Sequence, residues 1–190
     1  MNSLDLAYQE RILSHLRTLG IEEDYGHQRG LTLQSETADL VTVRILKDGR
    51  QIQLTPAVAQ SWAAMVESAT KDSVTLLLLS GFRSVEYQRQ ILEKKLGRGD
   101  QLKDILKINA APGYSEHHTG RAVDIGTPGC PPLEEDFERT DAFQWLREKA
   151  NYYGFHLSYP RGNRHGILYE PWHWMHRVTG LRNDDDNRRA

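Results

Sequence analysis

The chain has 190 residues, a formal net charge of −2 and a single cysteine. This length suits one domain with a sizeable hydrophobic core, and the small charge gives no electrostatic basis for binding nucleic acid or an anionic membrane surface. One cysteine excludes an intramolecular disulfide framework and a zinc site made of paired thiolates. No apolar run approaches the length of a membrane span.

Hydrophobic periodicity and turn signals predict a mixed set of elements along the chain. In order they are a helix at 4–19, a loop at 21–38, strands at 41–46 and 51–54, a helix at 56–68, a strand at 74–79, a helix between Ser84 and Gly97, a helix at 100–108, a strand at 122–125, a helix at 141–150, a strand at 155–159, and closing strands at 167–169 and 172–175.

Several local features support these elements. Asp48-Gly49 separates two β-rich runs, which is typical of a hairpin. Thr55 is a fitting N-cap for the helix that follows, with Ala57 and Trp62 on its expected buried side. Tyr87, Ile91 and Leu92 are expected on one face of the helix after Ser84. The continuous apolar run at 74–79 predicts a central strand buried on both faces.

The strands cluster without a strict βαβ rhythm, so we expect the α+β class: a small antiparallel sheet with flanking helices. Residues 1–70 are expected to form an N-terminal helix, hairpin and helix packed on a core domain at 71–180. Residues 181–190 are charged and lack apolar anchors, so we expect a flexible tail. The N-terminus does not resemble a signal peptide, which leaves the cytoplasm and export by another route both open.

The stretch 115–124, SEHHTGRAVD, holds the first set of candidate metal ligands. His117 and Asp124 are seven residues apart, a spacing that suits a loop leading into a strand, with Gly120 allowing the chain to reverse. His173 follows about fifty residues later in Glu170-Pro171-Trp172-His173. Two imidazoles and one carboxylate, with an open fourth position, are a common ligand set of a catalytic zinc ion.

Glu170 is the carboxylate left over from this set. Beside the metal without binding it, Glu170 would act as the general base that takes a proton from water. The alternative is that the histidines are surface residues or satisfied core residues, and that the aromatic residues near His173 are plain core packing. Both halves of the pattern occur together, each beside a β-like run, and this favours the metal site.

Arg83 is expected to emerge from the end of a buried strand. There it would hold a substrate carboxylate or stabilise an oxyanion. The alternative, favoured by spacing alone, is a surface arginine paired with Glu86. His118 is expected either to support the site from outside the ligand set or to be an ordinary loop residue.

The sequence resembles the VanY-type D-alanyl-D-alanine carboxypeptidases, zinc peptidases related to lysostaphin-like enzymes, VanX-type dipeptidases and the hedgehog domain. The resemblance spans about residues 74–180 and rests on three motifs in this order: Gly81-Phe82-Arg83-Ser84, Ser115-x-His117-x-x-Gly120-x-Ala122-x-Asp124, and Glu170-x-x-His173. It implies a small antiparallel sheet flanked by helices. It also implies that His117, Asp124 and His173 bind Zn²⁺ and that Glu170 is the general base. Arg83 would stabilise negative charge, and Ser115 would contact the substrate.

By this resemblance the expected function is zinc-dependent D,D-carboxypeptidase action on the terminal D-Ala-D-Ala bond of peptidoglycan stem peptides or their precursors. A peptidoglycan endopeptidase and a cytoplasmic D-Ala-D-Ala dipeptidase are alternatives with the same chemistry. A non-catalytic, zinc-containing binding domain is the alternative from another class, and the presence of Glu170 argues against it. We expect a monomer with a peptide substrate and without nucleic acid as a partner.

Overall fold

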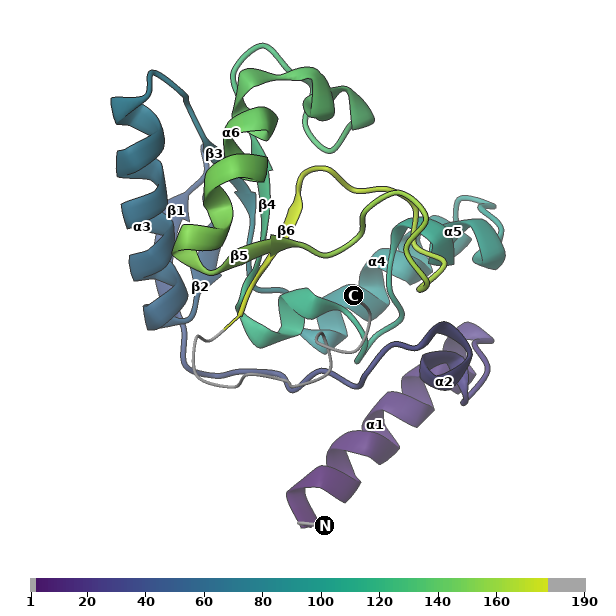
Figure 1. The fold of residues 1–190 in the computed structure, drawn as a ribbon. Coiled ribbons are helices and arrows are strands. Elements are labelled where there is room, and N and C mark those ends of the chain that lie inside the picture. Colours follow the sequence, from purple (N-terminus) through teal and green to yellow (C-terminus); the bar gives the residue numbers. More distant parts are fainter. Residues whose placement is uncertain (1–2, 178–190) are drawn as a thin grey trace, which may run out of the picture.

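A computed structural model describes residues 3–177 of the chain (Figure 1). The elements are, in order, α1 (Ser3–Leu19), α2 (Tyr25–Arg29), β1 (Val41–Ile45), β2 (Gln51–Leu54), α3 (Pro56–Lys71), β3 (Leu77–Ser80), α4 (Val85–Leu96), α5 (Leu102–Ile108), the 3₁₀ helix η1 (Glu116–Thr119), β4 (Ala122–Gly126), η2 (Glu135–Arg139), α6 (Asp141–Lys149), η3 (Ala150–Tyr153), β5 (Phe155–Leu157) and β6 (His173–His176). The mixture of helices and antiparallel strands confirms the predicted α+β class.

A four-stranded antiparallel sheet organises the molecule, with strand order β3-β4-β6-β5. All five residues of β4 are buried. Side chains alternate between the two faces of a strand, so Val123 and Ile125 point away from Asp124. Val123, Ile125 and Trp174 belong to the main hydrophobic core, which α3 and α6 complete. The other face of the same two strands is therefore free to carry polar residues.

The prediction that the apolar run at 74–79 forms a central strand was wrong, because β3 lies at an edge of the sheet. The apolar residues of β3 are nevertheless covered, because the β1-β2 hairpin lies against β3 (Figure 1). The Arg44 guanidinium donates to the Leu78 carbonyl at 2.7 Å, and Phe82 N donates to the Gln53 carbonyl at 2.7 Å. A covered edge strand is apolar for the same reason as a central one.

A second, smaller hydrophobic core joins the N-terminal segment to the helices that border the site. Ile12 and Leu16 of α1 pack with Val85 and Leu92 of α4 and with Ile105 of α5. Figure 1 shows α1 and α2 on the far side of α4 and α5 from the sheet. Burial of these apolar side chains fixes the position of α4 relative to the N-terminal segment.

Backbone contacts from the loop after α2 reach the motif that precedes β4. Gln34 N donates to the Gly113 carbonyl at 2.8 Å, and Thr37 N donates to the His118 carbonyl at 3.0 Å. Between them, Glu36 accepts the backbone N–H of Val85 at the start of α4, at 2.9 Å. The N-terminal segment therefore contacts both α4 and the segment that carries the candidate ligands. The division of the chain at residue 70 remains a prediction.

Several local predictions were confirmed and others were wrong. The Asp48-Gly49 hairpin forms, and Ser84 caps α4 by accepting the Tyr87 N–H at 3.0 Å. The loop predicted at 21–38 contains the short helix α2, and residues 167–169 do not form the predicted strand. Thr55 stands at the N-cap of α3 without a side-chain hydrogen bond.

The buried faces of two helices agree with the prediction only in part: Trp62 of α3 and Leu92 of α4 are buried as expected. In α3, Val58 is buried while Ala57 is exposed. In α4, Gln88 and Val85 are fully buried, whereas Tyr87 is exposed. The true face of α4 includes a polar residue, which hydrophobic periodicity could not identify. None of the helices in the described part of the chain is long and apolar enough to cross a membrane. The predicted tail at 181–190 lies outside the described residues.

Candidate metal centre

Strands β4 and β6 bring two of the three candidate ligands together. Asp124 and His173 are direct partners in the antiparallel pairing of these strands, and both point to the face opposite the main core. The His173 Nδ1 lies 3.2 Å from one oxygen of the Asp124 carboxylate. The register of the sheet thus sets this pair, although the two residues are 49 positions apart in the chain.

The turn η1 supplies the third candidate ligand, His117. The His117 Nδ1 donates to the Gly81 carbonyl at 2.7 Å, which leaves the lone pair of Nε2 facing the second Asp124 oxygen at 3.3 Å. Gly120 then ends the turn with φ of 65°, in the left-handed region that favours glycine. An added Cβ at Gly120 would lie 3.0 Å from the Leu40 and Thr37 side chains.

The chemistry of this donor set fits a zinc ion. One donor atom from each of His117, Asp124 and His173 lies within 4.8 Å of the others, and all three residues are buried. A tetrahedron with bonds of ~2.0–2.1 Å has edges of roughly 3.3 Å. The nitrogens of His173 and His117 lie 3.2 Å and 3.3 Å from the two different oxygens of the Asp124 carboxylate, each close to that edge length. Two imidazoles and a carboxylate are also the ligand types that zinc prefers.

Electrostatics support a cation at this place. Burial alone would raise the pKa of Asp124, but the charge and hydrogen bond of His117, together with His173, hold it well below its usual range. Burial alone would lower the pKa of His173, yet its hydrogen bonds to Asp124 and Glu116 raise it to about 10. The surrounding carboxylates therefore favour a positive charge between them, which a bound proton or a metal ion can provide.

Glu116 belongs to the site although the sequence reasoning missed it. One of its carboxylate oxygens lies 2.8 Å from the His173 Nε2 and accepts the Ser158 hydroxyl at 2.6 Å. A carboxylate on the far nitrogen of a ligating histidine fixes the tautomer and the orientation of the ring. Glu116 and His173 are 57 positions apart, so no local sequence signal could have paired them.

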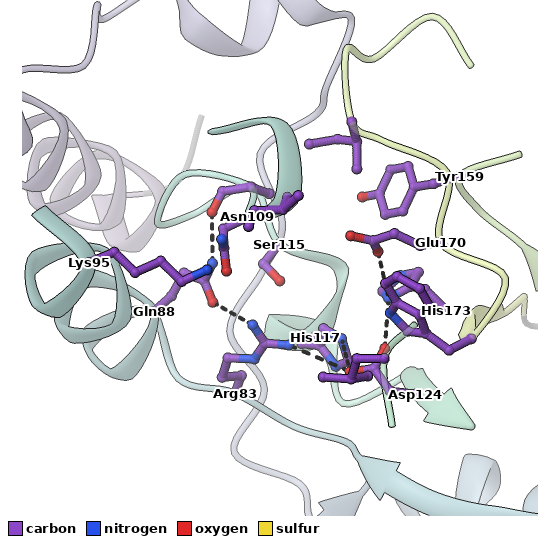
Figure 2. A pocket seen from close by; sticks show the side chains of 15 residues that line it. Arg83, Gln88, Lys95, Asn109, Ser115, His117, Asp124, Tyr159, Glu170 and His173 are labelled. Carbon is purple, nitrogen blue, oxygen red and sulfur yellow. Dashed lines mark hydrogen bonds and ion pairs between the residues drawn. The ribbon is translucent and has the colours of Figure 1, made fainter. Parts of the chain in front are cut away.

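Glu170 lies beside the ligand set without joining it. Its carboxylate is 3.9 Å from the His173 Nδ1 and lines the same cavity as the three ligands. Burial raises the pKa of Glu170 to about 7, partly opposed by His173. A carboxyl group with a pKa near the working pH can accept and return a proton. Figure 2 shows Glu170 close to His173 and Tyr159.

Arg83 reaches the site from the segment after β3, and the alternative pairing with Glu86 was wrong because Glu86 pairs with Arg89. The Arg83 Nη1 donates to the Gln88 side-chain oxygen at 3.0 Å, and Nη2 lies 3.8 Å from Asp124. Gln88 in turn donates to the Ala110 carbonyl at 2.8 Å. Gln88, which the sequence reasoning also missed, therefore holds the guanidinium in place.

His118 supports Arg83 from behind and does not line the cavity. Its Nδ1 donates to the Arg83 carbonyl at 2.6 Å, while Nε2 accepts the Gly113 N–H at 3.1 Å. Burial lowers the pKa of His118 to about 4, so the ring is neutral near pH 7. Of the two expectations for His118, the supporting one fits this geometry.

One cavity of about 260 Å³ contains every predicted site residue. Arg83, Ser115, His117, Asp124, Glu170 and His173 all line it. The Ser115 hydroxyl makes no hydrogen bond to another described side chain, so it is available to a ligand. Figure 2 shows these residues around one space, with His117, Asp124 and His173 at one end.

A buried metal-binding cluster beside a separate carboxylate is the arrangement typical of metal-dependent hydrolases. A comparison with known protein families identifies one that matches this chain. Residues 51–179 match the sequence model of the family described as VanY, D-alanyl-D-alanine carboxypeptidase. The chain belongs to this family.

Individual relatives agree with this assignment. The chain is 34% identical over 139 residues to the bifunctional D-Ala-D-Ala dipeptidase and carboxypeptidase VanXYC of Enterococcus gallinarum, covering 68% of this chain and 69% of that protein. The structure of the LD-carboxypeptidase LdcB is similar with a TM-score of 0.67 and 29% identity, covering 76% and 71% of the two chains. A VanY D,D-pentapeptidase mutant in complex with Zn(II) is similar with a TM-score of 0.56 and 25% identity, covering 76% and 80%.

The matched regions are only part of most of these proteins. The chain spans between 37% and 69% of the length of four curated relatives that it matches.

Proposed function

We propose that this protein is a zinc-dependent D,D-carboxypeptidase that hydrolyses the terminal D-Ala-D-Ala bond of peptidoglycan stem peptides or their precursors. The observation that carries the proposal is the union in one cavity of a His-Asp-His donor set, a carboxyl group with raised pKa and a fixed guanidinium. Family membership and the D-Ala-D-Ala substrates named for VanXYC support the choice of substrate.

His117, Asp124 and His173 would hold the zinc ion. Zinc in such a site lowers the pKa of water to roughly 7 and polarises a carbonyl oxygen. Glu170 would take the proton from the attacking water and return it to the leaving amine. Arg83, fixed by Gln88, stabilises the negative charge that develops on the scissile carbonyl oxygen. Ser115 offers its hydroxyl to the substrate backbone. We expect the protein to act as a monomer, which light scattering would test.

The stereochemistry of the cleaved bond separates two candidate substrates. LdcB is named an LD-carboxypeptidase, so an L,D bond in a tetrapeptide stem is the alternative substrate on the same machinery. The test uses pentapeptide stems ending in D-Ala-D-Ala, tetrapeptide stems, the free dipeptide and cross-linked sacculi. Each is digested with and without a chelator and read by mass spectrometry.

Loss of one alanine from the pentapeptide, stopped by the chelator, is the expected result. Cleavage of only one of the other substrates would support the proposed zinc-dependent hydrolysis and assign that substrate to the protein. No cleavage of any of them by the zinc-loaded protein would overturn the proposal and leave the non-catalytic binding domain.

Glu170→Gln tests the general base. The amide cannot accept the proton, so we expect kcat to fall by about 10²–10⁴-fold, while zinc content measured by atomic emission stays at the wild-type value. Wild-type kcat in this variant would refute the role of Glu170, and loss of zinc would assign Glu170 to metal binding instead.

A further inference from the structure

The cavity has two chemically different sides. The metal-binding cluster and Glu170 occupy one side. Lys95 of α4 and Asn109, just after α5, line the other. Figure 2 shows Lys95 extending from α4 toward the cavity on the side opposite Glu170 and His173, with Ser115 between them.

One arginine and one lysine line this cavity, and within the described chain only the arginine side chain is engaged by other residues. Arg83 donates to Gln88 at 3.0 Å and faces Asp124 at 3.8 Å. Lys95, by contrast, forms neither a hydrogen bond nor an ion pair through its ammonium with any residue of the described chain. The Lys95 side chain is partly buried, so its charge has lost part of its water without gaining a protein partner.

Two neighbouring amides on this side already make hydrogen bonds within the chain. The Gln88 amide gives its oxygen to Arg83 and its nitrogen to the Ala110 carbonyl. The Asn109 amide nitrogen donates to the Ile105 carbonyl at 3.2 Å. Burial lowers the pKa of Lys95, and although Asp100 opposes this, Arg83 and Arg98 act in the same direction as burial. A ligand anion placed here would relieve these unfavourable interactions.

The size of the cavity bears on the substrate. With about 260 Å³, it is smaller than the ~300–1,000 Å³ usual for ligand pockets, which favours small residues beside the scissile bond. In a peptide, the group after the scissile bond that carries negative charge is the α-carboxylate of a terminal residue. That residue's Cα lies ~3.8 Å from the preceding Cα, so its carboxylate stays close to the scissile bond and to the groups that line the cavity.

We propose that Lys95 binds the free α-carboxylate of the leaving residue and thereby restricts hydrolysis to the last peptide bond of a chain. This inference rests on the proposed function, and it deepens that function by assigning the residue that recognises the C-terminus. It makes the enzyme an exopeptidase and disfavours internal bonds, whose next residue offers an uncharged amide at this position. A side-chain carboxylate on the leaving residue has the same chemistry and is distinguished in the test.

The test compares N-acylated Lys-D-Ala-D-Ala with its C-terminal amide, using wild-type protein and Lys95→Met. Methionine keeps an unbranched apolar side chain and removes the charge. For wild type we expect kcat/KM to favour the free acid over the amide by about 10- to 100-fold, the range of a hydrogen bond to a charged group. In Lys95→Met we expect kcat/KM on the acid to fall by that factor, mainly through KM, with little change on the amide.

Control variants separate recognition from folding. Lys94→Met removes an exposed lysine from the same helix, and we expect kcat/KM on both substrates to stay within about twofold of wild type. Lys95→Arg keeps the charge and should retain most of the preference for the acid. Equal losses on acid and amide in Lys95→Met would indicate a structural role and overturn the inference, as would unchanged activity on the acid. A peptide amide whose leaving residue is D-Asp tests whether Lys95 binds a side-chain carboxylate instead. Cleavage of this amide that depends on Lys95 would assign the side-chain carboxylate, and not the α-carboxylate, as the group that Lys95 binds.

A binding experiment separates this inference from the proposed function. N-acetyl-D-Ala-D-Ala and its amide are titrated calorimetrically into zinc-loaded Glu170→Gln protein, with and without Lys95→Met. If the wild-type protein cleaves no peptide, a preference for binding the acid that Lys95→Met abolishes would still support the carboxylate site. Cleavage of D-Ala-D-Ala peptides without discrimination between acid and amide would keep the function and refute the role of Lys95.

Discussion

The two sides of the cavity are built on different principles. On the metal-binding side, the buried side chains of His117, Asp124 and His173 each contact at least two other polar groups of the protein. The contact between Asp124 and His173 follows from the pairing of β4 with β6. On the Lys95 side, the charged group comes from a helix surface and contacts no counter-ion in the described chain. The difference indicates that the chemical centre is pre-organised by the sheet, whereas the substrate itself completes the recognition side.

The strongest test of this contrast is to break the metal-binding side at its central residue. Asp124 contacts His117, His173 and Arg83, so Asp124→Ala removes a proposed ligand and leaves the other groups without their partner. We expect zinc affinity, measured by competition with a chromophoric chelator, to fall more than about 100-fold, which exceeds the usual effect of losing an outer carboxylate. Zinc affinity within a few-fold of wild type would contradict the assigned ligand set.

Glu116→Gln tests whether pre-organisation extends beyond the ligands. The amide keeps the size of the side chain but loses the charge that faces the His173 Nε2 at 2.8 Å. We expect zinc affinity to fall by about 10- to 100-fold, in the same competition assay. Glu22→Gln, an exposed glutamate near the end of α1, is the control and should bind zinc as the wild type does. Equal behaviour of the two variants would remove Glu116 from the site.

His118→Ala tests the support behind Arg83. The change leaves the Gly113 N–H and the Arg83 carbonyl without their buried partner, and each unsatisfied group costs ~1–3 kcal/mol. We therefore expect the free energy of unfolding, measured by urea denaturation with zinc present, to fall by roughly 2–4 kcal/mol. His118→Asn can keep the hydrogen bond to the Arg83 carbonyl and should lose less. An unchanged midpoint in His118→Ala would show that these groups find other partners.

The smallest effect is expected from a change in the N-terminal segment, where Arg29 links two segments that border the cavity. The Arg29 Nη1 donates to the Leu106 carbonyl on α5 at 2.7 Å and to the Gly166 carbonyl at 3.3 Å, close to the cavity-lining residues Ile108 and Ile167. Arg29→Met should cost about 1 kcal/mol of stability and raise KM about two- to fivefold at unchanged kcat. A change in kcat with constant KM would place its influence on the chemical side instead.

The sequence by itself determined the parts of this protein that depend on local patterns. The Asp48-Gly49 hairpin and the Ser84 cap follow from turn and capping chemistry, and the ligands occur in motifs whose spacing is visible in the chain. The same motifs also pointed to Arg83 and Glu170, which line the cavity in the structure.

Tertiary structure decided what depends on contacts between distant segments. The pairing of β4 with β6 aligned Asp124 with His173, and burial raised the pKa of Glu170. The edge position of β3 could not be predicted because the hairpin that covers it leaves its sequence as apolar as that of a central strand. No local sequence motif marks Glu116, Gln88 or Lys95 as site residues. Glu116 and Gln88 act on groups that only the folded chain brings near them. Lys95 is singled out because the described part of the folded chain brings no counter-ion to it.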